Sequence, residues 1–399
     1  MSLAGRDLIN MSDLSAQEID ALMESAAAMA EAIGLDDPET RQSAERLDRI
    51  MATAFFEPST RTRLSFESAM LRLGGGVLGF ADPAGSSVSK GESLADTART
   101  LSGYADVLVI RHPKMGAAKV AADAATIPVI NAGDGAHSHP TQTLTDLFCI
   151  MRTKGHFDGL TVGLMGDLRY GRTVHSLGPA LSRLGSRIIC ISPETLSMPQ
   201  RHLSQIEDTA AEPPVSVNAI DEVLDELDVL YATRVQIERF PEEQQANARE
   251  IAADFVINAA LMDRAPEDMI LMHPLPRVDE IDPEIDDDPR AVYFEQAHGG
   301  VAVRMALVAH LLGLIEQPRD GFRGFATPQE RPEEGAPGRA RTNAGAGEAK
   351  EVPAPADVDC RNVHCISNEE RFVSSFFKRL SGGRLACGYC EEPVEEAQT

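Results

Sequence analysis

The chain has 399 residues, which allows two or three domains, each with a core of its own. Its formal net charge of −25 at pH 7 argues against a general binder of nucleic acid or of anionic membranes, so any anion site has to be a local positive pocket. The first residues, MSLAGRDLIN, carry no apolar signal core, and no run of about 18 apolar residues occurs. We therefore expect a cytoplasmic protein.

The first segments have the spacing of a helix, a strand, a loop and a second helix. Residues 12–34 begin with Ser15 and Glu18, a capping-box pair, and continue as an amphipathic stretch rich in Ala, Met and Leu. Residues 51–56 are apolar and strand-like. A proline follows, and apolar side chains then recur at helical spacing over 64–73 until three glycines end the pattern.

The segment between that strand and that helix is rich in groups that bind anions. Residues 59–63, STRTR, bring hydroxyls, two guanidinium groups and free backbone N–H groups to the positive end of the predicted helix. An arginine fork can hold two oxygens of a phosphate or carboxylate at once, which a lysine ammonium cannot do. The sequence predicts a phosphate-binding corner; the alternative is a polar helix cap whose arginines are solvated.

Strands and helices alternate after this corner. The predicted elements are a strand at 77–80, a polar loop at 84–92, a helix at 94–104, and buried strands at 105–110 and 127–131. This alternation indicates parallel βαβ units, whose ligands bind at the carboxyl ends of the strands. Arg61, Arg111, His139 and Gln142 each follow a predicted strand, so we expect them to face one crevice. The loop holds Ser86 and Lys90 and is, in the simplest interpretation, a plain connection.

The pattern restarts after a helix at 143–153 that we expect to lead into a second domain. A strand at 160–165 is followed by a glycine-containing turn and a helix at 173–184. The GxGxxG spacing of dinucleotide sites is missing, and Arg172 stands at the helix entrance, so we favour a carboxylate or phosphate ligand over NAD. Later predicted elements are strands at 188–191, 229–232 and 270–272 and an apolar helix at 294–314.

The last part of the chain changes in composition. Residues 316–357 are rich in Pro, Gly, Glu, Arg and Ala, which predicts a linker. Four cysteines follow in two pairs: Cys360, Cys365, Cys387 and Cys390. Four thiolates in this spacing suit a tetrahedral zinc ion with a structural role, and redox-active or incidental thiols are the alternative. Cys149 and Cys190 lie in apolar sequence and are predicted to be packed thiols.

Seven motifs occur in order along the first 315 residues: FFEPSTRTRLSFE, VIRHP, HPTQTLTDLF, MGDLRYGRTVHSL, ATRVQIERF, LMHPLPRVDEI and YFEQAHGGVAVRMAL. Together they resemble the catalytic chain of aspartate carbamoyltransferases. The tail from CRNVHCIS to CGYCEE is similar to the zinc domain of the regulatory chain of the same enzymes. The resemblance implies an α/β fold class: two doubly wound parallel-sheet domains of the carbamoyltransferase type, fused to a small C-terminal zinc-binding β module.

The resemblance also implies the domain limits. We expect a carbamoyl phosphate-binding domain at 1–147, an aspartate-binding domain at 148–315, a linker at 316–357 and a zinc-binding domain at 358–399. The last helix of the second domain is expected to pack back on the first.

The family's roles carry over to matching residues of this chain. The resemblance assigns the phosphate to Ser59, Thr60, Arg61, Thr62 and Arg111, the carbonyl oxygen to His139, Thr62 and Arg111, and the carbamoyl amide to Gln142. It assigns the carboxylates of aspartate to Arg172, Arg234 and Gln236, and the incoming amine and the amide to the backbone carbonyls of Pro274 and Leu275. Glu57 is expected to pair with arginines across the domain cleft.

Ser86 and Lys90 match a loop that in the family reaches into the site of a neighbouring subunit, where Lys90 serves both substrates. The resemblance therefore implies a homotrimer with shared active sites. The zinc module is either an appendage or, as we favour, a bridge between two trimers.

The implied reaction is transfer of a carbamoyl group from carbamoyl phosphate to L-aspartate, in de novo pyrimidine biosynthesis. A neutral amine attacks the carbonyl carbon and phosphate leaves, so the catalyst has to supply positioning and stabilisation of the charged oxygen, without an organic cofactor. The alternatives are a carbamoyltransferase for another amine, such as ornithine, and a catalytically silent assembly scaffold. No nucleic acid or membrane partner is expected.

Overall fold

The computed structural model describes residues 2–37, 46–82, 87–235, 255–315, 351–353, 360–370, 373, 376–379 and 384–394. The chain divides into two compact units, one formed by Met1–Thr141 with Val301–Thr399 and the other by Gln142–Gly300. Within the described ranges, no helix combines the length and the apolar character needed to cross a bilayer.

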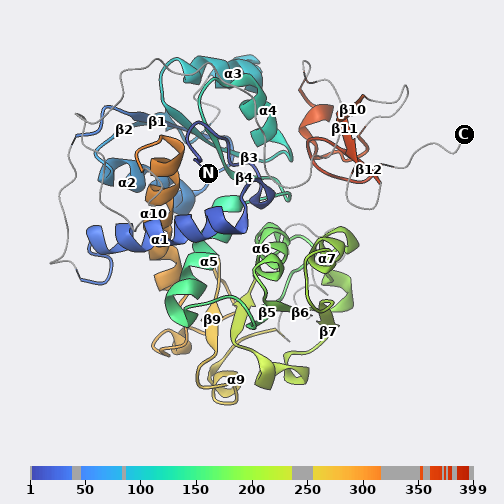
Figure 1. The fold of residues 1–399 in the computed structure, drawn as a ribbon. Coiled ribbons are helices and arrows are strands. Elements are labelled where there is room, and N and C mark those ends of the chain that lie inside the picture. Colours follow the sequence, from blue (N-terminus) through green and yellow to red (C-terminus); the bar gives the residue numbers. More distant parts are fainter. Residues whose placement is uncertain are drawn as a thin grey trace, which may run out of the picture. The chain divides into compact units, whose positions relative to one another are not determined.

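The first unit is built on a four-stranded parallel sheet with the order β2-β1-β3-β4 (Figure 1). Its strands are β1 (Ile50–Phe55), β2 (Gly76–Phe80), β3 (Val107–His112) and β4 (Val129–Asp134). In the register of β1 with β3, Phe55 lies beside Arg111, so the carboxyl ends of the two strands reach the same edge. A parallel bridge from Leu8 to Ile130 places the N-terminal segment beside β4.

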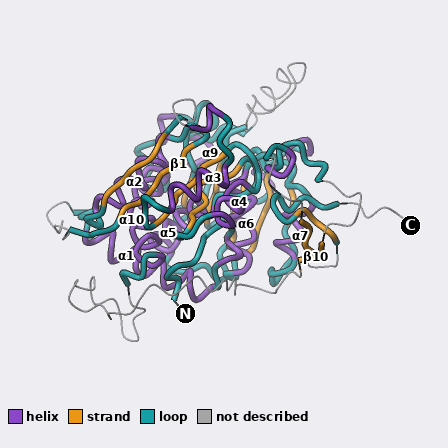
Figure 2. The backbone as a smooth tube through the Cα atoms, turned by 90° about the horizontal axis from the view of Figure 1, so that it is seen from above, coloured by secondary structure: helices purple, strands orange, loops and turns teal. Residues whose placement is uncertain are grey.

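Helices enclose this sheet, and Figure 2 shows strand segments lying between helical and loop segments. The helices of the first unit are α1 (Ala16–Ala32), α2 (Thr60–Arg72), α3 (Leu94–Ser102), α4 (Ala117–Ala124), the C-terminal part of α10 (Tyr293–Leu311), and the 3₁₀ turns η1 (Met11–Asp13) and η4 (Ser87–Lys90). The predicted capping box of α1 is confirmed, because Ser15 and Glu18 each accept a hydrogen bond from the other's backbone N–H. Ser25 of α1 bonds to His310 of α10 at 2.9 Å.

Several boundaries in the first unit differ from the prediction, and two of the differences change where candidate ligands lie. The helix predicted at 64–73 begins at Thr60, so most of the STRTR segment is its first turn and not a loop. Apolar periodicity cannot detect a polar first turn, which explains the error. Strand β3 extends to His112, so Arg111 lies within the strand and not beyond it.

The second unit has a five-stranded parallel sheet with the order β7-β6-β5-β8-β9. Its strands are β5 (Thr161–Met165), β6 (Arg187–Ile191), β7 (Val215–Val217), β8 (Val229–Ala232) and β9 (Ile270–Met272). Its helices are α6 (Arg172–Arg183), α7 (Gln200–Glu207), α9 (Ala259–Met262), most of α5 (Pro140–Lys154), the first part of α10, and the 3₁₀ turns η5 (Glu194–Leu196), η6 (Ile220–Glu222), η7 (Leu224–Glu226) and η10 (Pro283–Ile285). The short elements β7, α7 and α9 were not predicted.

The C-terminal segment forms a small antiparallel sheet in the order β10-β11-β12. The strands are β10 (Glu351–Pro353), β11 (Phe376–Arg379) and β12 (Leu385–Cys387), and the turn η12 (Ile366–Asn368) follows Cys365. Strand β10 lies inside the range predicted as linker, where pairing with β11 gives it regular structure. The predicted fold class is confirmed by the two parallel sheets and this small β module.

A glycine on the edge strand β2 provides a test of the first sheet. Gly79 has φ +152°, and a Cβ added there would lie 2.1 Å from the carbonyl oxygen of Thr53 on β1. We expect Gly79→Ala to lower the free energy of unfolding by about 1–3 kcal/mol, because the strand must shift to remove the clash. Gly76→Ala, whose Cβ would be 3.6 Å from its nearest neighbour, is the control. Equal urea midpoints for the two variants would contradict the prediction.

Candidate active site and metal centre

The first group of predicted ligands lies at the start of α2. Ser59 is the N-cap residue, and its side chain makes no capping hydrogen bond. The first helical bond in this turn runs from the backbone N–H of Arg63 to the carbonyl oxygen of Ser59, so the N–H groups ahead of it have no partner within the helix. Thr60 and Arg61 are exposed and Thr62 is buried. The predicted corner therefore presents hydroxyls, N–H groups and a guanidinium group together.

Arg111 is a buried cation of the first unit. Its side chain is 10% exposed and pairs with the Glu57 carboxylate at 3.1 Å, and it also donates to the carbonyl oxygen of Ala132. A buried guanidinium group needs such partners, because leaving it unpaired away from water is costly. Glu57 thus pairs with an arginine of its own unit, on the strand next to β1.

His139 is buried directly before α5, and its Nδ1 lies 3.4 Å from the hydroxyl of Thr141. Because β1, β3 and β4 run parallel, the start of α2, Arg111 and the segment that leads to His139 all lie at the carboxyl edge of one sheet. The structure therefore gathers these predicted phosphate and carbonyl ligands at one edge.

A buried carboxylate that the sequence did not reveal organises the segment before His139. Asp134 accepts hydrogen bonds from Asn131 at 2.9 Å, from the N–H of Ser138 at 3.2 Å and from the N–H of Gly116 at 2.7 Å, and its other contact is the imidazole of His137 at 3.0 Å. These bonds fix the turn and join it to the loop after β3. Asn131, His137 and Ser138 lie within four residues of Asp134 in the sequence, whereas Gly116 comes from a separate segment that no spacing rule would link to it.

His137 lies between two carboxylates. Its Nδ1 faces Asp134 and its Nε2 is 3.7 Å from an oxygen of Glu391 in the C-terminal module. Burial alone lowers the pKa of His137, but Asp134 and Glu391 outweigh burial and raise that pKa to about 10. His137 is therefore an imidazolium at neutral pH. By contrast, burial lowers the pKa of His112 to about 4, so that its Nδ1 can accept the N–H of Lys114.

Three further predicted ligands are Lys90, Ser86 and Gln236. Lys90 ends η4 with an exposed side chain. Ser86 and Gln236 lie outside the described residues.

A second group of predicted ligands lies at the carboxyl edge of the other sheet. Arg172 is the first residue of α6, after the turn that follows β5, and Arg234 follows β8, the neighbour of β5. Gly166 permits close approach of the two segments, because a Cβ there would lie 2.4 Å from the carbonyl oxygen of Thr233. Thr233 bonds to the carbonyl oxygen of Met165 through both its N–H and its hydroxyl. The two arginines thus come from adjacent strand ends.

The loop after β9, the next strand along, holds Pro274 and Leu275. Leu275 has φ +54°, a conformation that costs about 1–3 kcal/mol for a residue with a side chain. Its N–H donates to Nδ1 of His273, whose Nε2 contacts Glu280 at 2.9 Å. These bonds hold the predicted carbonyl ligands in a defined geometry.

Gln142 is held by a second buried carboxylate that sequence reasoning missed. Its amide donates to Asp146 at 2.8 Å, and Asp146 also accepts from Gln296 at 2.6 Å and from the hydroxyl of Tyr231 at 2.9 Å. Burial beside this carboxylate raises the pKa of Tyr231 well above its usual range, so the hydroxyl stays a donor. The network orients the Gln142 amide.

The four cysteines of the C-terminal module form a compact group. Their sulfur atoms all lie within 4.8 Å of one another, and none forms a disulfide. The Sγ atoms of Cys360 and Cys390 are 3.5 Å apart, and those of Cys365 and Cys387 are 3.8 Å apart. A tetrahedral site with Zn–S bonds of about 2.3 Å has sulfur separations of about 3.8 Å, so this donor set fits a metal ion of that kind.

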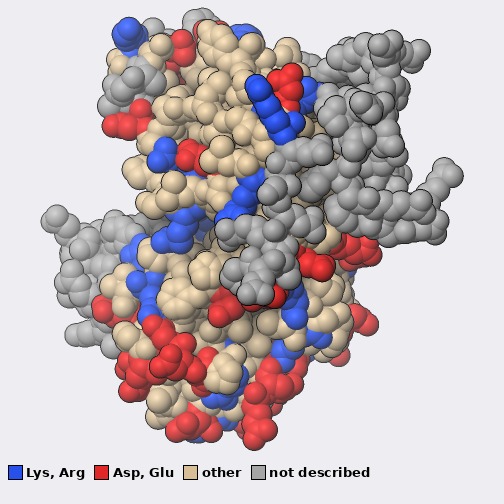
Figure 3. Space-filling model, turned by 90° about the vertical axis from the view of Figure 1, so that its left-hand side faces the viewer, with Lys and Arg blue, Asp and Glu red and all other residues tan. Residues whose placement is uncertain are grey.

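The surface charge is uneven. Figure 3 shows one face on which Asp and Glu side chains gather over the lower part of the picture, while Lys and Arg side chains form smaller groups. With a net charge of −25, attraction of an anion has to come from local guanidinium groups such as that of Arg61.

Three family models match the chain. Residues 6–152 match the carbamoyl-P binding domain of aspartate/ornithine carbamoyltransferase, and residues 158–311 match the Asp/Orn binding domain of the same family. Residues 355–399 match the metal binding domain of the aspartate carbamoyltransferase regulatory chain.

Individual relatives agree with these matches. The chain is 49% identical over 316 residues to the aspartate carbamoyltransferase catalytic subunit of Thermococcus onnurineus, covering 79% of this chain and 100% of that one. It is 49% identical over 305 residues to that of Halorubrum lacusprofundi, covering 76% and 94%.

Solved structures are similar as well. The aspartate transcarbamoylase of Trypanosoma cruzi in complex with carbamoyl phosphate and aspartate has a TM-score of 0.72 at 43% identity, covering 78% of this chain and 98% of that one. The catalytic subunit of the M. jannaschii enzyme has a TM-score of 0.71 at 44% identity, covering 77% and 98%. This chain therefore belongs to the aspartate carbamoyltransferase family.

Proposed function

We propose that this chain transfers the carbamoyl group of carbamoyl phosphate to L-aspartate, forming N-carbamoyl-L-aspartate and phosphate in de novo pyrimidine biosynthesis. The observation that carries the proposal is the pair Arg172 and Arg234 at the ends of adjacent strands. Aspartate has two carboxylates, whereas ornithine has one carboxylate and an ammonium group. Two guanidinium groups at one edge favour the dicarboxylate. The relatives named for aspartate support the same choice.

In this proposal the first unit binds the phosphate. The first turn of α2 supplies N–H groups and the hydroxyls of Ser59, Thr60 and Thr62, and Arg61 and Arg111 supply charge. The substrate phosphate competes with Glu57 for the Arg111 guanidinium group. Because a dianion offers more charge than one carboxylate, it is the stronger partner.

The chemistry needs a neutral amine aimed at the carbonyl carbon. Charge then develops on the carbonyl oxygen, where His139, Thr62 and Arg111 donate to it, and Gln142 holds the amide. Carbonyl oxygens of Pro274 and Leu275 accept from the amine and the amide. The tetrahedral intermediate collapses as phosphate leaves, and phosphate takes the proton of the amine. We place the limits of the carbamoyl phosphate, aspartate, linker and zinc regions at 1–147, 148–315, 316–357 and 358–399.

The metal of the C-terminal module is, in this proposal, zinc. Four sulfur ligands complete a tetrahedron, so the ion has no open position for a substrate and contributes folding free energy. Cys360, Cys365, Cys387 and Cys390 hold it.

We also propose a homotrimer with shared sites. Lys90 is exposed at the end of η4, which suits a side chain that completes the site of a neighbouring subunit together with Ser86.

An assay of carbamoyl transfer with aspartate beside ornithine tests the function. We expect turnover with aspartate alone. Arg234→Gln should raise KM for aspartate about tenfold or more, because a charge-assisted hydrogen bond is lost. Arg264→Gln, which removes an exposed arginine paired with Asp221 in the same unit, should leave KM unchanged. Turnover of ornithine, or of neither amine, would refute the proposal.

Mixing of inactive variants tests the shared site. Arg61→Ala and Lys90→Ala should each lower activity by roughly 100-fold or more, because each removes a cation that stabilises the reacting oxygens. Subunit exchange between the two should restore part of the activity, since some mixed sites then contain both wild-type residues. A mixture of Arg61→Ala with Arg111→Ala is the matched control, because both losses fall on the same half of a site. Equal recovery in the two mixtures, or none in the first, would exclude sharing.

Metal analysis tests the zinc assignment. We expect one zinc ion per chain in the wild type and none in Cys387→Ser, because three thiolates bind zinc much more weakly than four. Cys190→Ala, which removes a buried thiol of β6, should keep the ion. Retention of zinc by Cys387→Ser would contradict the ligand set.

A further inference from the structure

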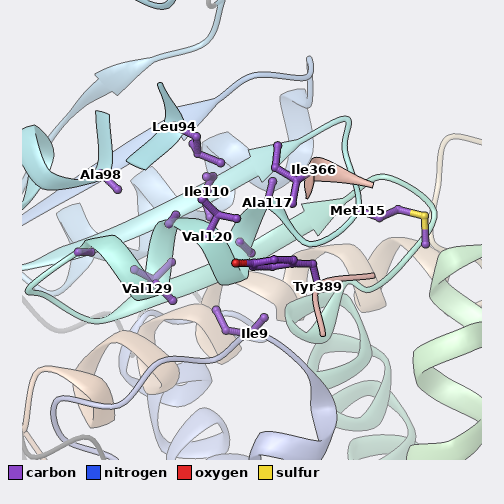
Figure 4. Close-up of a cluster of buried hydrophobic side chains, with 14 of the residues drawn as sticks. Ile9, Leu94, Ala98, Ile110, Met115, Ala117, Val120, Val129, Ile366 and Tyr389 are labelled. Carbon is purple, nitrogen blue, oxygen red and sulfur yellow. The ribbon is translucent and has the colours of Figure 1, made fainter. Parts of the chain in front are cut away.

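The C-terminal module and the first unit's parallel-sheet domain share one hydrophobic cluster. Ile366 and Tyr389 of the module are buried among side chains that include Ile9, Met115 and Val120 (Figure 4). Figure 4 shows the ring of Tyr389 lying flat among these side chains. The sulfur ligands belong to the same cluster. The module is therefore part of the core of this unit and not a separate appendage.

Main-chain hydrogen bonds also join the module to the loop after β3, and we call this junction the seam. The N–H of Met115 donates to the carbonyl oxygen of His364, and the N–H of Ile366 donates to the carbonyl oxygen of Met115, both at 3.0 Å. At the next residue, Gly116, a Cβ would lie 2.6 Å from the Cβ of Tyr389. This close fit fixes the loop that follows β3, the strand that carries Arg111.

A second contact reaches the turn that leads to His139. Glu391 of the module faces Nε2 of His137 at 3.7 Å, and His137 faces Asp134 through its Nδ1. Asp134 in turn accepts the N–H groups of Ser138 and of Gly116. A continuous chain of contacts thus runs from the module to the loop after β3, the strand that carries Arg111, and to the turn that leads to His139.

Both the backbone and the side chain of Glu391 have unusual surroundings. Its φ is +59°, in the left-handed region that glycine and asparagine adopt more readily. The carboxylate bonds to Lys378 of β11 and contacts His137, so it is held from both sides. Glycine would adopt this turn with less strain. The glutamate is therefore better explained by the contacts of its carboxylate than by the turn itself.

We infer that Glu391 is a positioning residue for the active site. Through its ion pair with His137, and through Asp134, it holds residues 131–139 in the conformation that presents His139. The inference rests on the proposed function only for the role of His139. Through Glu391, the C-terminal module then determines the turnover rate as well as contributing to stability.

The test compares Glu391→Gln with the wild type in the full chain. We expect faster amide hydrogen exchange at residues 134, 135, 137 and 138, whose N–H groups bond within this turn or to His112. We also expect kcat/KM for carbamoyl phosphate to fall about tenfold, because misplacing a catalytic group by a fraction of an ångström costs on that order. KM for aspartate and the zinc content should be unchanged.

The control is Glu369→Gln, which removes the ion pair of Glu369 with Lys114 at the exposed rim of the same seam. We expect wild-type exchange and kinetics for it. Equal losses in Glu369→Gln and Glu391→Gln would mean that docking in general matters, and would overturn the specific role of the pair.

A variant outside the module keeps the test decisive if Glu391→Gln loses zinc. His137→Gln should reproduce the faster amide exchange and the lower kcat/KM for carbamoyl phosphate. The double variant should have a kcat/KM no lower than that of the more impaired single variant, because both substitutions remove the same interaction. Wild-type exchange in His137→Gln would overturn the inference. A wild type that fails to carbamoylate aspartate would refute the proposed function instead, and the exchange experiment would still decide the role of Glu391.

Discussion

Parallel strand pairing is the constraint on which the rest of this structure depends. In both sheets every strand points the same way, so residues far apart in the chain arrive at one edge. The start of α2, Arg111 and the turn before His139 meet at one sheet, and Arg172 and Arg234 meet at the other. A molecule with a large negative charge can bind anionic substrates only if its guanidinium groups are collected in this way, because dispersed cations would be outweighed by the acidic surface.

Much of this was predictable from local patterns. Strand β8 and strand β9 have the predicted bounds, because short apolar runs between turn signals define them well. The capping box at Ser15 and the two cysteine pairs were also predictable, since their chemistry needs only residues close in sequence. The candidate ligands followed from motif resemblance, which assigns roles residue by residue but says nothing of what holds each side chain in place.

The residues that hold the ligands were not predictable. Asp134 and Asp146 look like ordinary acidic residues in the sequence, yet both are fully buried and each gathers donors from separate segments. The polar first turn of α2 has no apolar period to mark it. Glu391 follows a zinc ligand and looks like one of many surface glutamates until tertiary structure places His137 beside it. These interactions depend on tertiary packing, which a single sequence does not encode in any short pattern.

The close fit of Gly116 against Tyr389 has a consequence for assembly in dilute solution. When a metal module belongs to a separate polypeptide, its contact with a catalytic domain follows mass action and dissociates as the concentration falls. Here both partners of the contact belong to one polypeptide, so their local concentration is set by the connecting segment and is independent of dilution. Each catalytic domain is also translated together with its metal domain, so expression cannot produce one without the other. A contact of modest intrinsic affinity is then sufficient to remain occupied.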